Sequence, residues 1–409
     1  MNKRFMKALP GLLAAAVVAP LLTSGTAHAI PAFARQAKTA CATCHTIMPE
    51  LTEAGANFKK NGFVWEQKGA AKEAGAEKEY LLLSTIPEFV PLSLSVDLGA
   101  AYDDKLEGGK KFDFAARSVK LQAGGNFGEK VGFWASYKLY TEASEKFDNT
   151  MYANVAPNSL PDLIEAYAVG RKLFDTPVNF KVGRFQPGVS LWEKEDRTTL
   201  SEYATTATSA GDSLFKLDAP GDGAELNAVV LPRLFVAAGG IKRKNVSEGD
   251  FYLSAAYKLM GEDFNSRAAE NPNHFSATVG AFGYSGTNLV GAAKEKNHFY
   301  RAGVEGDLAY MHTRAKLAYF MGEDKVAAAG AKVEPTVVSA ELSCLCGKQF
   351  MPAVRFERVE QKQVSVREYN YIGAITYAPL QSLKIVGEVK YTDAGSTNTT
   401  YNLGLTGAF

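Results

Sequence analysis

The sequence has 409 residues, a formal net charge of +1 at pH 7, and 22% charged residues, so it lacks the basic excess typical of nucleic-acid-binding proteins. Its 37 glycines, 11% aromatic residues and four cysteines exclude a disordered chain and a disulfide-dense domain. This composition is typical of a β-protein rich in glycine and aromatic residues.

The first 29 residues have the three-part pattern of a secretory signal peptide. Lys3, Arg4 and Lys7 precede the apolar run LLAAAVVAPLL, and small residues follow it. We expect cleavage after Ala29 and export of the mature chain. The apolar run is too short to span a bilayer, and no later segment approaches the roughly 20 apolar residues that a membrane helix needs.

The exported chain begins with one Cys-x-x-Cys-His motif, formed by Cys41, Cys44 and His45. Two thiols three residues apart on a helical turn can bond both vinyl groups of one haem, and the following imidazole then binds the iron. We therefore predict Cys41 and Cys44 as thioether anchors and His45 as the proximal iron ligand of one covalent haem c. The export signal supports this prediction, because such haem is attached outside the cytoplasm.

Two alternatives remain for this motif, a plain disulfide between Cys41 and Cys44 or half of a zinc site. Zinc would need two further ligands, and the remaining cysteines, Cys344 and Cys346, are about 300 residues away. Neither alternative explains why a histidine follows immediately.

A short helix is predicted after the motif. Leu51 and Phe58 share one helical face, Pro49 suits a first turn and Gly62 suits a stop. The polar, Ala/Gly-rich residues that follow predict a linker over 66–89.

From residue 90 to residue 409, apolar and polar residues alternate in segments of roughly ten. We count about 16 segments, an even number as bacterial single-chain barrels require. They begin near residues 90, 112, 131, 162, 177, 224, 234, 251, 275, 299, 310, 336, 349, 366, 382 and 399.

Short and long connections alternate between these segments, as periplasmic turns and extracellular loops do, although 262–273 is long for a periplasmic turn. We therefore predict an all-β fold: an antiparallel outer-membrane β-barrel behind a small α-helical haem domain. A soluble β-sandwich is the alternative that the same alternation allows.

A second axial ligand is not evident near the motif, since Met48 is only one helical turn from His45. Candidates must come from the barrel. His312 alternates with two cationic residues, so we expect it in the lumen near a periplasmic turn, as the candidate distal iron ligand. His274 and Met351 are weaker candidates by the same argument. For each, an ordinary lumenal or interfacial role is the favoured alternative.

Charged residues on the lumenal face provide further candidates. Glu305, Asp307, Glu357 and Glu388 could attract a hard cation, although ordinary solvation is the favoured alternative.

The pair Cys344 and Cys346 lies at a predicted periplasmic strand end. In an extended strand their Cα atoms would be about 6.6 Å apart, so a disulfide requires a bend there. Two small apolar residues are the default interpretation.

Residues 31–63, PAFARQAKTACATCHTIMPELTEAGANFKKNGF, resemble the haem-attachment segment of the fused outer-membrane cytochrome–porins of iron-oxidising bacteria. The shared positions are Pro31, Phe33, Ala34, Arg35, Gln36, Cys41, Cys44, His45, Pro49, Leu51, Gly55, Phe58, Lys59 and Gly62. The resemblance implies a monohaem cytochrome c domain over 30–65 and a porin-like barrel over 90–409.

That resemblance also implies a function. The chain would be an electron-transfer protein with a candidate Fe(II) oxidase activity. It would take electrons from extracellular Fe(II) and pass them through the haem to a periplasmic c-type cytochrome. The alternatives are a porin with a haem-containing plug and a conduit for a different extracellular donor or acceptor.

Overall fold

The computed structural model describes residues 32–37, 41–64, 91–103, 105, 112–140, 162–193, 196–209, 215–243, 248–266, 275–290, 295–325, 332–347, 349–361, 366–380 and 382–408. The predicted signal peptide, the predicted linker over 66–89 and His274 lie outside these residues. None of the helices in the described ranges has the length and apolar character needed to span a lipid bilayer.

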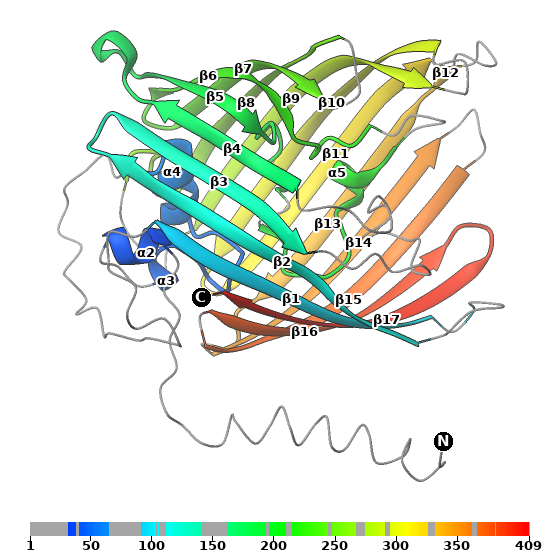
Figure 1. Cartoon of the computed structure of the whole chain (residues 1–409). Coiled ribbons are helices and arrows are strands. Elements are labelled where there is room, and N and C mark those ends of the chain that lie inside the picture. The colour runs from blue at the N-terminus through cyan, green and yellow to red at the C-terminus, as the bar shows by residue number, and fades with distance from the viewer. Residues whose placement is uncertain are drawn as a thin grey trace.

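One closed antiparallel sheet forms the wall of the molecule (Figure 1). Its strands are β1 (Leu92–Asp103), β2 (Phe112–Phe127), β3 (Val131–Tyr140), β4 (Asp162–Gly170), β5 (Val178–Phe185), β6 (Gly221–Leu231), β7 (Leu234–Arg243), β8 (Asp250–Met260), β9 (Ser276–Val290), β10 (Glu295–Tyr310), β11 (Thr313–Lys325), β12 (Lys332–Val333), β13 (Pro335–Cys344), β14 (Phe350–Gln361), β15 (Val366–Leu380), β16 (Leu383–Asp393) and β17 (Thr397–Ala408).

Each strand pairs with its neighbour in the chain, and β17 returns to pair with β1. Because β12 and β13 both pair with β11, they share one position, and the 17 described strands fill 16 positions around the barrel. The predicted barrel is confirmed. Each predicted segment start lies within four residues of an observed strand start.

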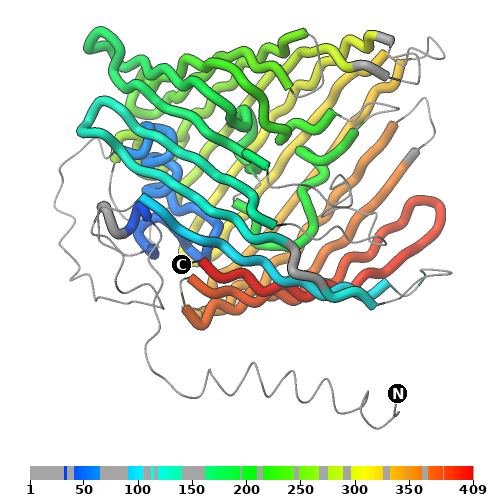
Figure 2. Tube along the Cα trace, viewed as in Figure 1, coloured from blue at the N-terminus to red at the C-terminus, as the bar shows by residue number. Residues whose placement is uncertain are grey.

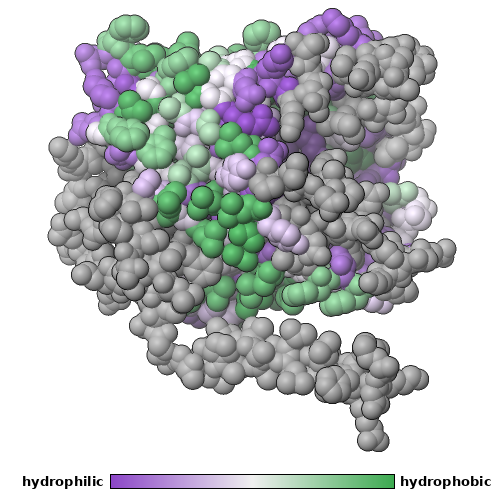
Figure 3. Space-filling model, in the orientation of Figure 1, coloured by the Kyte–Doolittle hydropathy of each residue, from purple (hydrophilic) through white to green (hydrophobic). Residues whose placement is uncertain are grey.

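The alternation of side chains explains this agreement. Val354 is 59% exposed on the outer surface, while its neighbour Arg355 is 2% exposed on the lumenal face. Figure 3 shows apolar residues gathered over the visible barrel wall, where lipid replaces water. An apolar exterior with a charged interior is wrong for a soluble β-sandwich, so that alternative is excluded.

The two ends of the barrel differ. The tight turns β2–β3, β6–β7 and β10–β11 lie at the same end as the start of β1 and the end of β17. The β3–β4 and β5–β6 connections lie at the other end and are much longer. In outer-membrane barrels the end with short turns faces the periplasm.

Three short helices lie at this periplasmic opening: α2 (Ala32–Ala37), α3 (Cys41–Cys44) and α4 (Glu53–Lys60) (Figures 1 and 2). The predicted start of α4 at Pro49 is wrong. Thr52 is the N-cap, since its side chain accepts a hydrogen bond from the Gly55 N–H, and the preceding residues form a turn. The remaining helices are η1 (Leu173–Asp175) and α5 (Ala204–Ala207).

The β5–β6 connection folds into the lumen, where α5 contacts β11, β13 and β14. We call residues 186–193 and 196–209, the first two described parts of this connection, the inward loop. Trp192 and Tyr203 of this loop are fully buried in an apolar cluster with lumenal side chains of the wall. From the wall the cluster includes Phe185, Tyr252, Tyr284, Phe299 and Phe320, and Phe215 joins it from the β5–β6 connection. Part of the lumen is therefore a packed core.

Candidate functional site

The Cys-x-x-Cys-His motif forms a single helical turn. Cys41 and Cys44 are the first and last residues of α3, and both are half-buried. The His45 backbone N–H donates to the Cys41 carbonyl at 2.9 Å, which continues the turn. The two thiols therefore lie on one turn with the imidazole directly after them, as attachment of haem c requires.

The His45 ring is oriented by the backbone. Its Nδ1 lies 3.1 Å from the Pro49 carbonyl oxygen, so Nδ1–H donates and Nε2 keeps its lone pair. Metal-bound histidines have this arrangement, because the hydrogen bond at one ring nitrogen fixes the tautomer and leaves the other nitrogen for the metal. Burial lowers the pKa of His45, and the Pro49 hydrogen bond opposes this shift only in part. The neutral ligand form is therefore favoured.

Helix α4 holds the motif in place. The Thr52 N–H donates to the Cys44 carbonyl at 2.9 Å, and the Thr52 hydroxyl donates to the Thr43 carbonyl at 2.8 Å. A Cβ on Gly55 would lie 2.2 Å from the Cys44 carbonyl oxygen, so only glycine permits this approach. We call residues 41–64, which contain the motif and α4, the plug.

The β8–β9 turn receives the plug. The Asn57 side-chain amide donates to the Asp263 and Ser266 carbonyls at 2.9 and 3.1 Å, and the Asn61 amide donates to the Phe264 carbonyl at 2.8 Å. This turn is the periplasmic connection that is unusually long in the sequence. Its length therefore has a structural reason, since it carries the carbonyl groups that bind α4.

Two glycines on β2 and β3 allow the plug and α2 to pack closely against this side of the wall. A Cβ on Gly132 would lie 1.9 Å from the Gly62 carbonyl oxygen, and one on Gly124 would lie 2.4 Å from the Phe33 ring. Phe33 stacks on Phe63 with ring centroids 4.7 Å apart. The plug backbone at Gly62 and the Phe33 ring of α2 therefore occupy space that a larger wall residue would fill.

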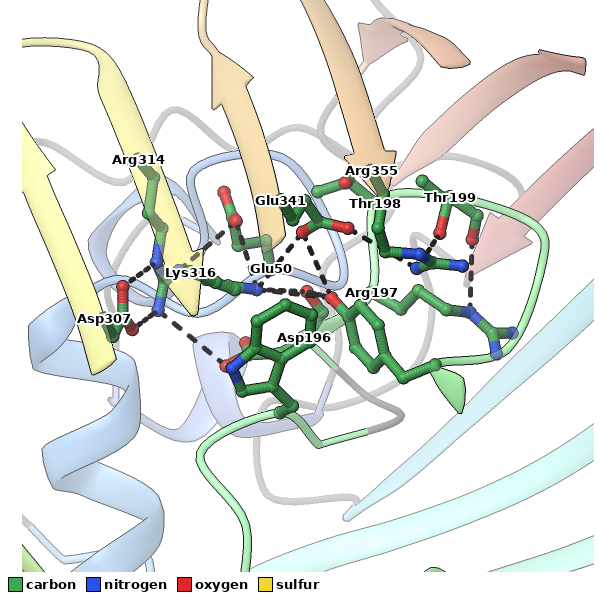
Figure 4. Close-up of polar contacts among 12 residues, drawn as sticks. Glu50, Asp196, Arg197, Thr198, Thr199, Asp307, Arg314, Lys316, Glu341 and Arg355 are labelled. Atoms are coloured by element: carbon green, nitrogen blue, oxygen red, sulfur yellow. Dashed lines mark hydrogen bonds and ion pairs between the residues drawn. The ribbon is translucent and has the colours of Figure 1, made fainter. Parts of the chain in front are cut away.

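A charged network joins the plug, the wall and the inward loop (Figure 4). Glu50 of the plug is 1% exposed, and its Oε1 lies 3.3 Å from Arg314 Nη1 and 3.7 Å from Lys316 Nζ, both from β11. Arg314 also donates to the Leu51 carbonyl at 3.0 Å. The Leu51 N–H donates to Asp196 of the inward loop at 2.6 Å. These contacts fix the plug against both partners.

The lumenal carboxylates bind the inward loop instead of solvent. Glu388 accepts from the Leu200 N–H at 2.6 Å and from Ser201, and Glu357 accepts from the Ala204 N–H at 2.8 Å. Glu305 accepts from the Ser190 hydroxyl and the Leu191 N–H.

The sequence-based expectations for these carboxylates are therefore corrected. Ordinary solvation is wrong for Glu305, Glu357 and Glu388, which are buried, and Asp307 pairs with Arg314. Among the described residues, no group of three or more His, Cys, Asp or Glu side chains is arranged to hold a metal ion.

A small cavity lies between the plug, the inward loop and the wall. A cavity of about 70 Å³ is lined by charged side chains that include Lys59, Glu193, Lys258 and Asp307. It has room for only a few water molecules.

Comparison with known proteins agrees with this architecture. The family model of the phosphate-selective porins O and P matches residues 92–290, which run from β1 to β9. The chain is an outer-membrane barrel of the porin type. The matched residues do not include the plug.

Solved structures with this porin-type fold include the anion-selective porin from Comamonas acidovorans, at 11% identity and a TM-score of 0.58, covering 78% of this chain and 99% of that one. OprB of Pseudomonas putida has 10% identity and a TM-score of 0.54, covering 78% and 94%. The channel DcaP of Acinetobacter baumannii has 12% identity and a TM-score of 0.53, covering 78% and 97%. A comparison with curated proteins gives no match.

The structure separates the candidate distal ligands of this porin-type barrel. The strand position expected for His312 is wrong, because Met311 adopts a left-handed conformation and His312 is exposed in the β10–β11 turn. Met351 is buried and packs on Ile47, two residues from His45. This apolar contact fits the favoured alternative for Met351. Iron ligation by His312 or Met351 stays a prediction.

Some residues of the site were not found by sequence reasoning. Glu50 gives no local signal, because its partners Arg314 and Lys316 lie more than 260 residues away in the chain. Asn57 and Asn61 do give one. They are four residues apart, so they lie on one helical face, next to the apolar Phe58. Two amides on a face that is buried need hydrogen-bond partners, so this spacing was the available signal for a docking surface.

Proposed function

We propose that this porin-type barrel carries one covalent haem c on its plug and transfers electrons at the outer membrane. The observation that supports the proposal best is the His45 ring, which follows the Cys41–Cys44 turn and whose Nδ1 lies 3.1 Å from the Pro49 carbonyl oxygen. A disulfide does not need this histidine, and the described residues offer no further ligand group for zinc.

Each residue of the motif would have a separate role in binding the haem. Cys41 and Cys44 would anchor the haem, His45 Nε2 would bind the iron, and the Pro49 carbonyl keeps the imidazole in the required tautomer. Bound haem supplies the one-electron chemistry that side chains lack. A haem on the plug would lie at the periplasmic opening, where a soluble c-type cytochrome could approach it.

The filled lumen favours electron transfer over bulk diffusion. Ordinary porins keep a water-filled channel, whereas here the inward loop, its aromatic cluster and the plug occupy much of the interior. A haem needs contact only with its redox partners, so a barrel that holds it in the membrane is useful without a wide channel.

Extracellular Fe(II) as donor, and Fe(II) oxidase activity with it, are proposed from the resemblance alone. The lumenal carboxylates bind the inward loop, so they do not support an iron site inside the barrel. Anaerobic mixing of the oxidised protein with Fe(II) tests this donor. Haem reduction by Fe(II) supports it, while reduction by dithionite but not by Fe(II) indicates a different donor.

The haem assignment is tested with the full mature chain, expressed with c-type maturation and purified in detergent. We expect a visible c-type spectrum and haem staining that survives denaturing electrophoresis. The Cys41→Ala/Cys44→Ala variant should lose both while the barrel stays folded. The matched control is Cys344→Ser/Cys346→Ser, which should keep the haem. Unchanged colour in the first variant, or colourless wild-type protein, contradicts the assignment.

A second candidate is an anion-selective diffusion channel whose plug has a structural role. The match to the phosphate-selective porins and the similarity to the anion-selective porin from Comamonas acidovorans favour this candidate. Reversal potentials across planar bilayers in a salt gradient test it. Anion-selective conductance without redox turnover of the haem would favour this function over electron transfer.

A further inference from the structure

Two cysteines outside the plug share one turn on the periplasmic rim. Cys344 is the last residue of β13, and Cys346 forms an isolated bridge with Phe350, its N–H donating to the Phe350 carbonyl at 2.7 Å. Gly347 follows with a φ of +68°, which turns the chain into β14. The segment is therefore bent, as a disulfide between these two cysteines would require, and is not an extended strand.

The bend brings the two thiols together. Their Sγ atoms are 3.5 Å apart, and both cysteines are free. Cys346 is exposed and Cys344 is half-buried. A disulfide has an S–S distance of about 2.05 Å, so the sulfurs need to approach by only about 1.5 Å. The turn therefore presents a preformed, accessible thiol pair.

The residue between the cysteines reaches the plug. Leu345 packs in a small apolar cluster with Ile47, Met351 and Ala378, and its N–H donates to the His312 carbonyl at 2.7 Å. Ile47 is two residues from His45. A change in the turn that moves Leu345 is therefore transmitted through this cluster to the segment that carries the motif.

We propose that Cys344 and Cys346 are a redox modification site, which a periplasmic disulfide oxidant converts reversibly into an intramolecular disulfide that alters the packing of the plug. The Cys346 thiolate attacks one sulfur of the oxidant's disulfide, forming a mixed disulfide and releasing the other sulfur as a thiol. The Cys344 thiolate then attacks Cys346 Sγ and releases the second thiol. The pair loses two protons and two electrons, which reduce one disulfide of the oxidant to two thiols.

Glutathione disulfide is the probe for the thiol chemistry, applied to the full mature chain in detergent. After alkylation and trypsin digestion, residues 333–348 form one peptide that contains both cysteines and no others. We expect this peptide to carry no alkyl group and to be lighter than the dithiol peptide by two hydrogen atoms. When reduction precedes alkylation, it should carry two alkyl groups. This readout is independent of haem, so it separates failure of this proposal from failure of the proposed function.

Single variants test the two-step chemistry. Cys344→Ser and Cys346→Ser each lack the second thiol, so each should retain a glutathione adduct that the wild type does not accumulate. Two alkylated cysteines after oxidation of the wild type, or a persistent adduct on it, would overturn the disulfide. A peptide that holds a soft metal ion in place of a disulfide would also overturn it.

Amide hydrogen exchange tests the contact with the plug. We expect exchange over residues 45–48 to change about twofold or more between the reduced and oxidised wild type, because Leu345 packs against the apolar cluster that contains Ile47. The Cys344→Ser/Cys346→Ser variant is the matched control and should show no change with oxidant. Disulfide formation without any change over 45–48 would overturn the coupling.

Discussion

The inward loop and the plug both fill the lumen, yet different forces hold them. The loop is bound through its backbone, since Glu388 and Glu357 accept from loop N–H groups and Arg355 donates to loop carbonyls. The plug is bound largely through its own side chains, including Glu50 and Asn57. The polar contacts of the inward loop therefore depend mainly on which side chains the wall carries. Those of the plug depend on the plug's own side chains as well.

This difference has an energetic consequence. Arg355, Glu341 and Glu357 are almost completely buried, so loss of one partner leaves charges without compensation. The plug also has a buried ion pair, Glu50 with Lys316, but its Lys59–Glu193 ion pair with the inward loop is partly exposed, and solvent screens it. The inward loop should therefore be the more strongly fixed of the two, and the plug the more readily displaced.

The largest expected effect is that of Arg355→Ala on the inward loop. The change removes donors to the Ser201 and Glu202 carbonyls, leaves Glu357 buried without its ion-pair partner, and leaves Glu341 with Lys316 alone. We expect the loop to be destabilised by about 3–5 kcal/mol and single-channel conductance to rise as it leaves the lumen. Arg367→Ala, which removes an exposed ion pair with Glu360, is the control. Equal conductance of the two variants would contradict the role of Arg355.

Gly132→Ala should displace the plug while leaving the barrel intact. The new Cβ would overlap the Gly62 carbonyl oxygen, and overpacking of this kind costs about 1–3 kcal/mol. Trypsin should then cleave faster after Lys59 and Lys60, while heat-modifiable mobility stays normal. Gly387→Ala, where nothing lies within 4 Å of the added carbon, is the matched control. Equal cleavage rates in both variants would show that the β2–β3 wall does not seat the plug.

Acid should weaken the plug by a smaller amount. Burial raises the pKa of Glu193, but the charges of Lys59 and Lys60 outweigh burial and hold this pKa below its ordinary value of 4.5. A depressed carboxyl pKa contributes stability that is complete above 4.5 and is lost as the pH falls towards the folded-state value. Because the pair is partly exposed, we expect about 1 kcal/mol or less.

Amide exchange over residues 53–60 measures this effect at about pH 6 and about pH 3.5, after correction for intrinsic exchange rates. Protection of α4 should fall in acid for the wild type. Glu193→Gln should have lower protection at the higher pH and a smaller change between the two. Burial raises the pKa of Asp196, so protonation of Asp196 in acid favours the folded state. This contribution is present in both the wild type and Glu193→Gln, so it does not explain a difference between them. Identical pH profiles would exclude Glu193 as the source.

Local patterns in the sequence predicted the strands and their boundaries well, because the two-residue period of a strand is carried by adjacent residues such as Val354 and Arg355. The same rule failed for His312, which continues the alternation of β11 by one residue but lies in the turn. Whether a strand continues or turns there depends on the backbone conformation at Met311, which the alternation of side chains does not report.

The site shows the same division. The spacing of Cys41, Cys44 and His45 is set by the chain itself and does not depend on the fold. The candidate haem site was therefore evident from five consecutive residues. Glu305, Glu357 and Glu388 were identified as inward-facing, but their partners were not, because these partners come from a connection more than 100 residues away.

The sequence alone determined the strand period, the apolar outer surface and the haem-attachment motif, because each depends on residues that are neighbours along the chain. Only the tertiary structure decided that the β5–β6 connection and the plug fill the lumen, and that Glu50 meets Arg314. Closing the sheet into a barrel sets which distant residues face each other, and no local pattern contains those pairings.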